Sequence, residues 1–260
     1  MKGLTMFSLE NRKVLIVGGA GGLGTAISAA MLGQGADVII GDLKVSAAIK
    51  VAEDLGKTHK NRIVKGVEID VTSEESVKSG IKQAEELVGG FDIVVCAAGI
   101  GEVCLIEDMS FAAWRRMVAI HLDGTFLVIR NTVSHMLKQE FGRYICFSSI
   151  ASLQGVEKQA HYAAGKGGVD GFVRSFSREV AGRGITVNAI APGYFESPLN
   201  DLASPERLQA LRQNVPVGRF GLPSEIGSLA VFLASSESAY ITGEVISPNG
   251  GFKYCAHLDL

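Results

Sequence analysis

Short runs rich in Val and Ile alternate along this chain with helix-length amphipathic segments, and this alternation constrains the fold more than any other feature. The seven apolar runs cover residues 13–17, 37–41, 62–69, 91–97, 143–148, 185–191 and 244–247. Most of them are almost continuously apolar, as strands are when both faces of a parallel sheet are buried. The segments at 24–34, 46–56, 74–88, 111–138, 160–181 and 223–235 carry apolar residues at three- and four-residue spacing, which is typical of packed helices. The sequence therefore predicts an α/β fold with a doubly wound parallel sheet of seven strands.

Composition favours one globular domain that binds neither membrane nor nucleic acid. The 260 residues are 47% hydrophobic and show no break in composition, so a single domain over 1–260 is expected. A net charge of −2 without a basic block argues against a nucleic-acid partner, and no run of 18 apolar residues could span a membrane. The four cysteines form no CxxC pair and no metal-ligand spacing. We expect a cytoplasmic protein with reduced thiols and no metal.

The least regular part of the chain lies at 192–222. It follows a predicted strand and contains one short helical pattern near 205–213. Long irregular inserts at the carboxyl end of a strand often cover a ligand site. We therefore predict a substrate lid at 194–215.

A glycine-rich stretch, V-G-G-A-G-G-L-G at 17–24, joins the first predicted strand to the first predicted helix. Free backbone N–H groups and the helix dipole at such a junction favour a pyrophosphate, and glycine permits its close approach. Gly19, Gly21 and Gly24 match one dinucleotide register, and Gly18, Gly22 and Gly24 match another. The alternative is a plain structural turn. A nucleotide-triphosphate loop is excluded because no Gly-Lys-Ser/Thr follows.

An acidic residue, Asp42, ends the second predicted strand, 18 residues beyond Gly24. A carboxylate at about this spacing accepts both ribose hydroxyls of NAD and repels the 2′-phosphate of NADP. Neither Gly21 nor Leu43 is basic, so NAD is favoured, although Lys44 leaves NADP open. The alternative for Asp42 is a solvated turn residue.

Three side chains predict acid–base chemistry on a substrate oxygen. Tyr162 and Lys166 are four residues apart and share one helix face, and Ser149 ends the strand 13 residues earlier. A nearby ammonium is expected to lower the pKa of the phenol from its ordinary value of about 10. Tyr162 would then exchange a proton with a carbonyl or alcohol, and Ser149 would donate to the developing oxyanion.

The order of these features resembles the classical short-chain dehydrogenase/reductase family, from about residue 9 to 251. The matching pieces are V-G-G-A-G-G-L-G at 17–24, D-V at 70–71, C-A-A-G at 96–99, S-S at 148–149, Y-A-A-G-K at 162–166, V-N-A-I-A-P-G at 187–193 and I-T-G at 241–243. The resemblance implies a Rossmann-fold oxidoreductase that is a homotetramer or homodimer, with 111–138 and 160–181 as the interface.

The resemblance also implies which residues hold the cofactor. It selects the register Gly18, Gly22 and Gly24, and it implies that Lys166 binds the nicotinamide ribose beside Tyr162. The other implied contacts are Leu23 in the glycine loop, Leu43 after Asp42, Asp70 and Val71 at the adenine, Ala98 and Gly99 along the cofactor, and Pro192, Gly193 and Ser197 at the nicotinamide.

One departure from the family pattern concerns the reaction directly. His121 stands where the family usually has an asparagine, which is thought to hold a water that connects the lysine to solvent. A histidine can also donate and accept hydrogen bonds, so we predict that His121 keeps this relay and makes it sensitive to pH near neutrality. The alternative is a buried histidine that braces the helix backbone. His161, next to Tyr162, is expected at a solvated helix start.

These observations predict an oxidoreductase that moves a hydride between NAD(H) and a small-molecule substrate that is a secondary alcohol or ketone. A 3-oxoacyl-thioester reductase, acting on an acyl-carrier-protein or coenzyme A substrate, is the alternative within enzymes. The alternative outside enzymes is an NAD-sensing binding protein without turnover. The combination of Ser149, Tyr162 and Lys166 favours an enzyme, since a binding protein needs no such set.

Overall fold

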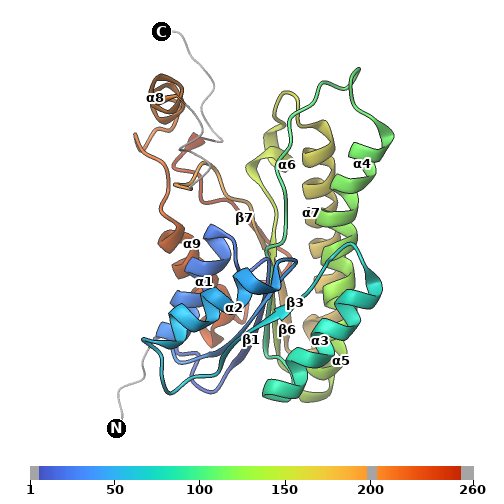
Figure 1. The fold of residues 1–260 in the computed structure, drawn as a ribbon, viewed down its shortest axis with the longest axis vertical. Coiled ribbons are helices and arrows are strands. Elements are labelled where there is room, and N and C mark those ends of the chain that lie inside the picture. Colours follow the sequence, from blue (N-terminus) through green and yellow to red (C-terminus); the bar gives the residue numbers. More distant parts are fainter. Residues whose placement is uncertain (1–5, 198–203, 253–260) are drawn as a thin grey trace.

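A central sheet of seven parallel strands organises the computed structural model, which describes residues 6–197 and 204–252 (Figure 1). The strands are β1 (Lys13–Val17), β2 (Asp37–Asp42), β3 (Val64–Glu68), β4 (Ile93–Cys96), β5 (Gly142–Phe147), β6 (Ile185–Ile190) and β7 (Val245–Ile246). Their order in the sheet is β3-β2-β1-β4-β5-β6-β7. The predicted doubly wound seven-stranded fold is confirmed.

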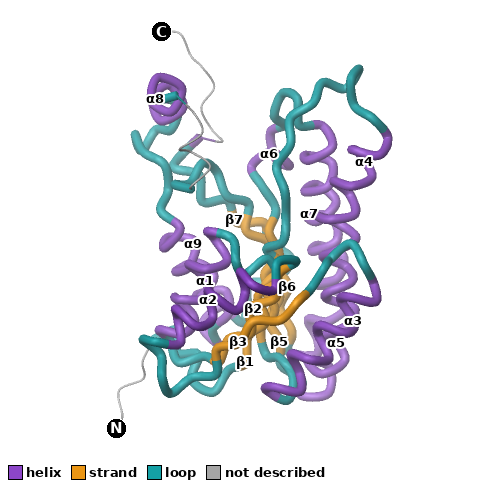
Figure 2. Tube along the Cα trace, viewed as in Figure 1, coloured by secondary structure: helices purple, strands orange, loops and turns teal. Residues whose placement is uncertain are grey.

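Helices cover both faces of the sheet, which explains why its strands are apolar throughout (Figures 1 and 2). One face carries α1 (Gly22–Gly33), α2 (Val45–Gly56) and α9 (Pro223–Ala234), and their apolar residues share a core with Ile16, Ile40 and Ile145. The other face carries α3 (Glu74–Val88), α5 (Gly124–Gln139) and α7 (Ala160–Val180), packed on Leu15 and Tyr144. Other short elements are α6 (Ile150–Gln154), α8 (Pro205–Gln213), η2 (Ala181–Arg183) and η4 (Ser236–Ser238).

The helix predicted at 111–138 is wrong in one respect, because a wide turn interrupts it. The structure divides it into α4 (Phe111–Val118), a π-helical turn η1 (Ala119–Asp123) and α5. A π turn holds one extra residue per turn and is frequent at functional sites. His121 lies in the middle of this turn, so the irregularity sets where its side chain points.

The predicted lid at 194–215 lies partly outside the described residues. Its helix is confirmed as α8, whereas 198–203 is among the residues that the structure does not describe. The action of this segment as a lid stays a prediction. So does association through 111–138 and 160–181.

Membrane and metal features are absent from the residues that the structure describes. No helix among them is long and apolar enough to cross a membrane. Nor do they contain a group of three or more His, Cys, Asp or Glu side chains placed to bind a metal. Within the same ranges Cys96, Cys104 and Cys146 are free thiols.

The carboxyl ends of β1 and β4 form the edge where ligands are expected. β1 pairs with β2 on one side and β4 on the other, so the chain changes direction across the sheet at this point. In open parallel sheets, ligands bind in the crevice outside such a switch point. The predicted site segments at 17–24, 96–99 and 148–149 all follow strands that end at this edge.

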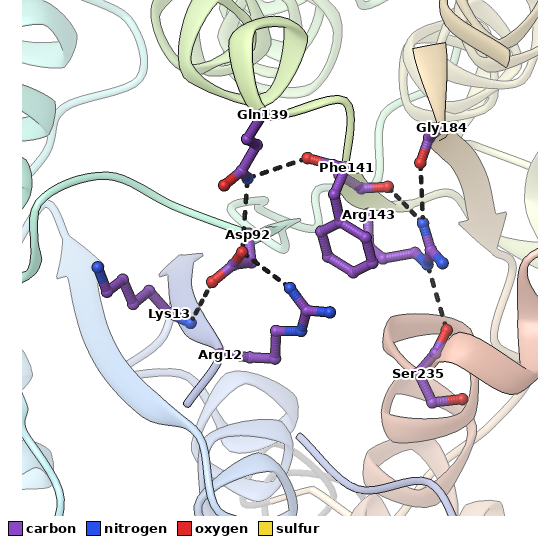
Figure 3. Close-up of polar contacts among 9 residues, drawn as sticks. Arg12, Lys13, Asp92, Gln139, Phe141, Arg143, Gly184 and Ser235 are labelled. Atoms are coloured by element: carbon purple, nitrogen blue, oxygen red, sulfur yellow. Dashed lines mark hydrogen bonds and ion pairs between the residues drawn. The ribbon is translucent and has the colours of Figure 1, made fainter. Parts of the chain in front are cut away.

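A partly buried polar cluster holds the amino ends of the strands together (Figure 3). The Asp92 carboxylate accepts from the Arg12 guanidinium at 3.1 Å, from the Lys13 backbone N–H at 2.9 Å and from Gln139 at 3.4 Å. Buried Arg143 donates to the carbonyls of Gly142, Gly184 and Ser235. Arg12 lies 3.7 Å and Arg143 4.5 Å from the centroid of the Phe141 ring. These contacts tie the starts of β1, β4, β5 and β6 together.

We expect Asp92→Asn to destabilise the fold without affecting the distant ligand edge. The amide nitrogen would face donors that now converge on a carboxylate, and an unsatisfied buried group costs about 1–3 kcal/mol. Urea unfolding followed by circular dichroism measures this loss. The control is Asp54→Asn, which removes an exposed carboxylate bound by Lys50 and Lys57 and is expected to change little. Equal unfolding curves for Asp92→Asn and wild type would contradict the role given to this cluster.

Candidate active site

Ser149 lies where the chain leaves β5 and enters the short helix α6. It is the N-cap of that helix, and its Oγ accepts a hydrogen bond from the Ala151 backbone N–H at 3.1 Å. Serine is favoured here because its side chain satisfies a helix donor that has no partner within the helix. The cap fixes the Ser149 hydroxyl at the carboxyl edge of the sheet, where only 9% of the residue is exposed.

Tyr162 and Lys166 lie on one face of α7, as their spacing predicts. The Lys166 ammonium is 5.9 Å from the centroid of the Tyr162 ring. Hydrogen bonding by the Ser149 hydroxyl acts to lower the pKa of Tyr162. Ser149 and Tyr162 line one open pocket of about 700 Å³ together with Pro192 and Gly193. The structure thus brings together the three side chains that the sequence selected from separate segments.

Burial acts in opposite directions on the two ionisable groups of this set. It raises the pKa of Tyr162, and the hydrogen bond from Ser149 only partly offsets it. It lowers the pKa of Lys166 from 10.5 to about 8. Lys166 Nζ donates to the Phe147 carbonyl at 2.6 Å. The expected lowering of the Tyr162 pKa by the ammonium is therefore wrong for this structure, because desolvation of the phenolate dominates.

His121 is buried behind Tyr162, with its ring edge-on to the phenol at 5.1 Å between centroids. Its Nε2 lies 3.0 Å from the Ile100 carbonyl oxygen, to which it donates in one tautomer, and its Nδ1 has no partner among the described residues. A side chain on Gly99 would place its Cβ 2.6 Å from His121 Cε1, so glycine is needed there. The contact with Ile100 braces the π turn against the loop that follows β4.

Titration of His121 near neutral pH, which the sequence predicted, is wrong. Burial first, and then the Lys166 charge, lower its pKa from 6.5 to about 3. The ring is consequently neutral at physiological pH. A relay through the neutral ring stays a prediction. The expectation for His161 is also wrong, since this residue is fully buried rather than solvated.

A second pocket, of about 790 Å³, lies beside the first and carries seven of the fifteen predicted cofactor residues. These seven are Gly18, Asp42, Leu43, Asp70, Val71, Ala98 and Gly99. Gly22, Leu23 and Gly24 form the first turn of α1. Pro192 and Gly193 line the neighbouring pocket, and Ser197 follows them in the same loop, outside both linings.

The glycine loop has the shape that a dinucleotide requires. Gly18 has φ +82°, and a Cβ on it would lie 2.5 Å from the Ala98 backbone nitrogen. A Cβ on Gly24 would lie 2.6 Å from Gly19 Cα, whereas one on Gly22 would meet nothing within 4 Å. The first and third glycines therefore allow close backbone packing, and the second leaves open space at the start of α1. This arrangement fits the register Gly18, Gly22 and Gly24.

Asp42 is held against this loop. One carboxylate oxygen accepts from the Ala20 backbone N–H at 3.2 Å, and the other from the Lys44 backbone N–H at 3.1 Å. The carboxylate therefore lies in the pocket at the end of β2, where a ribose is expected. With the glycine loop and the helix N-terminus, it forms a donor and acceptor set that fits a nicotinamide dinucleotide.

Sequence reasoning missed two lining residues of the cofactor pocket. Arg116 and Ile120 reach it from α4 and η1. No local motif marks them, because each enters a pocket through the packing of its helix or loop. Arg116 forms an ion pair with Glu102, which lies in the loop after β4.

Comparison with known proteins identifies the family. The family model described as enoyl-(acyl carrier protein) reductase matches residues 18–253. The chain belongs to the classical short-chain dehydrogenases/reductases. The 3-oxoacyl-(acyl-carrier-protein) reductase of Aquifex aeolicus is 37% identical over 243 residues, covering 94% of this chain and 98% of that protein. The crystal structure of gox2181 is 35% identical with a TM-score of 0.91, covering 96% of this chain and 98% of its own. Levodione reductase is 27% identical with a TM-score of 0.89, covering 95% of this chain and 99% of its own.

The buried, neutral state of His121 predicts how the free energy of unfolding depends on pH. The unfolded chain binds a proton at this residue below pH 6.5, whereas the folded chain does so only near pH 3, so stability falls as pH falls through this window. Between pH 7 and pH 4.5 the loss from this group is about 3 kcal/mol. His121→Asn removes this contribution, so its unfolding free energy depends less on pH. Urea unfolding at both pH values measures the difference.

A matched substitution controls for general effects of acid. His59→Asn makes the same substitution at a half-buried histidine in the segment before β3 and is the matched control. If His121→Asn loses as much stability between pH 7 and pH 4.5 as wild type does, the proposed state of His121 is wrong.

Proposed function

We propose that this protein is a nicotinamide-dinucleotide-dependent carbonyl reductase, which also runs in reverse as a secondary-alcohol dehydrogenase. The observation that carries the proposal is the meeting of Ser149, Tyr162 and Lys166 beside the glycine-loop pocket. Ser149 and Tyr162 present two oxygen atoms to one opening, so both hydroxyls can bind a single substrate oxygen. The NAD-sensing alternative uses only the glycine loop and leaves this set without a role.

The chain's own groups account for proton transfer and charge stabilisation. Tyr162 gives a proton to the substrate oxygen during reduction and takes it back during oxidation. Ser149 donates a hydrogen bond to the negative charge that develops on that oxygen. Lys166 places a positive charge one helical turn from the phenol and would also bind the ribose. A bound nicotinamide supplies or accepts the hydride.

The protonated state of Tyr162 suits the general acid that carbonyl reduction needs. Burial raises the pKa of the phenol, so the group stays protonated. A protonated phenol is the form that a general acid needs, whereas alcohol oxidation needs the phenolate. The name of the Aquifex aeolicus relative, a reductase of 3-oxoacyl groups, agrees with this direction.

A 3-oxoacyl thioester is the first substrate to test. Several relatives that are 34% to 38% identical carry the name 3-oxoacyl-(acyl-carrier-protein) reductase. Val103, Ile150, Val156 and Leu211 give the pocket of Tyr162 an apolar wall that suits an acyl chain. The broader alternative is a small ketone or secondary alcohol. Assays with acetoacetyl-coenzyme A, a panel of ketones and the matching alcohols separate these possibilities. Each assay follows the absorbance of the reduced cofactor.

Removal of the phenolic oxygen tests the mechanism. We expect Tyr162→Phe to lower kcat/KM by roughly 10²–10⁴-fold, as for loss of a general acid, and Ser149→Ala by roughly 10²–10³-fold. Cofactor affinity, measured by quenching of protein fluorescence, is expected to change little for Ser149→Ala. Tyr240→Phe alters a fully exposed tyrosine and is the matched control, with unchanged turnover expected. Normal turnover by Tyr162→Phe would contradict the mechanism.

Asp42 is proposed to select NAD(H) over NADP(H). Its carboxylate would accept the ribose hydroxyls of NAD and repel the extra phosphate of NADP. We expect Asp42→Ser to reduce the ratio of kcat/KM for NADH to that for NADPH by roughly 10²-fold, which corresponds to a coupling of about 3 kcal/mol. Steady-state assays with both cofactors measure the ratio. Asp37→Asn, at the other end of β2, is the control; a wild-type preference for NADPH would contradict the assignment.

A further inference from the structure

A buried carboxylate, Asp170, lies one helical turn beyond Lys166 on the same face of α7. Only 3% of the residue is exposed. Its Oδ2 accepts from the Ser152 hydroxyl at 2.7 Å, and its Oδ1 has no hydrogen-bond partner in the described part of the chain. Burying a carboxylate is unfavourable unless its hydrogen bonds repay the lost hydration. Packing of α7 alone would be served better by an apolar side chain at this position.

Ser152 connects this carboxylate to the turn that carries Ser149. Its hydroxyl lies 2.7 Å from the Ser149 carbonyl oxygen and 3.0 Å from the Ser148 hydroxyl. Ser148 Oγ lies in turn 3.4 Å from the Lys166 carbonyl oxygen. The network therefore runs from α7 to α6 and back to α7, and it touches the backbone of both Ser149 and Lys166.

The number of protons fixes how this network is arranged. Ser152 has one hydroxyl proton, and the Asp170 carboxylate is the strongest acceptor within its reach. Ser152 therefore donates to Asp170, and the single proton of Ser148 goes either to Ser152 Oγ or to the Lys166 carbonyl. With no acceptor at position 170, the Ser152 hydroxyl would turn to the Ser149 carbonyl, and the link between α6 and α7 would be lost.

We propose that Asp170 is a positioning residue: through Ser152 it holds the Ser149 turn of α6 against α7, one helical turn from Lys166. This inference rests on the proposed function, because it assigns Asp170 to the alignment of the same reaction. The network sets the separation between the hydroxyl that polarises the substrate and the group that transfers the proton. Small displacements of such groups change rates strongly, up to roughly 100-fold for about 1 Å.

The charge of Asp170 adds an effect that a purely structural contact would not have. Asp170 favours the ammonium form of Lys166 and so opposes the effect of burial on its pKa. Asp170→Asn keeps an acceptor oxygen for Ser152 but removes this charge, so the pKa of Lys166 falls further below about 8. Ser152→Ala removes the link and keeps the charge. The two variants therefore separate alignment from electrostatics.

The experiment compares steady-state reduction by wild type, Ser152→Ala, Ser152→Thr, Asp170→Asn and Asp170→Ala over a range of pH. We expect Ser152→Ala and Asp170→Ala to lower kcat by roughly 10–100-fold with little change in KM. Ser152→Thr restores the hydroxyl and most of the rate. Asp170→Asn moves the alkaline limb of the kcat profile to lower pH, whereas Ser152→Ala leaves the limb in place. The double variant Ser152→Ala/Asp170→Ala is expected to be no slower than the slower single variant, since both break one link.

Controls keep this test distinct from that of the proposed function. Ser177→Ala removes a buried serine of α7 that lies outside the network, and this variant is expected to turn over at the wild-type rate. If Asp170→Ala does not fold, Ser152→Ala carries the test. Wild-type protein that reduces none of the substrates would overturn the proposed function, and with it this role of Asp170. This inference alone would be overturned if wild type is active, if Ser152→Ala and Asp170→Asn both keep kcat within twofold of the wild-type value, and if all three proteins share one pH profile.

Discussion

The close approach of two backbone segments, the glycine loop after β1 and the chain after β4, underlies both the fold and the site. A side chain on Gly18 would overlap the backbone of Ala98, so the two strand ends can meet only because Gly18 has none. This contact places the cradle for a dinucleotide directly beside the pocket of Tyr162. Since β1 and β4 are adjacent at the switch point of the sheet, one short edge collects residues from distant parts of the chain.

Burial gives this edge its chemistry. Desolvation disfavours any charged form, so it raises the pKa of Tyr162 and lowers that of Lys166 and His121. The site therefore has a neutral proton donor in Tyr162, a neutral imidazole in His121 and an amine in Lys166 whose protonation depends on its neighbours. A buried carboxylate near Lys166 is valuable in such a place, because little solvent is present to screen or replace it.

Much of this organisation could be predicted from the sequence because it depends on local patterns. Continuous apolar runs indicated strands buried on both faces, and the four-residue spacing of Tyr162 and Lys166 placed them on one helix face. Asp42 was identified from another local pattern, its position at the end of the second apolar run. These inferences need only the periods of helices and strands and the rule that parallel strands end at one edge.

The rest depends on packing between distant segments, which no local pattern records. The π turn at Ala119–Asp123 has no distinctive composition, and its position became visible only with the contact between His121 and Ile100. Predicting the direction in which the pKa of Tyr162 shifts requires knowing how far the phenol is removed from water. A signal for Asp170 was present, since an acidic residue four positions after Lys166 falls on the buried face of α7, but its partner Ser152 comes from another helix.

The polar cluster around Asp92 and Arg143 lies at the amino ends of the strands, and both pockets lie at the carboxyl ends. The contacts that stabilise the fold and the pockets that bind ligands thus lie at opposite ends of the same strands. Loops at the ligand-binding end can diverge in length and sequence while the contacts at the other end stay intact. Such a division of labour lets one scaffold serve catalysts with names as different as levodione reductase and 3-oxoacyl-(acyl-carrier-protein) reductase.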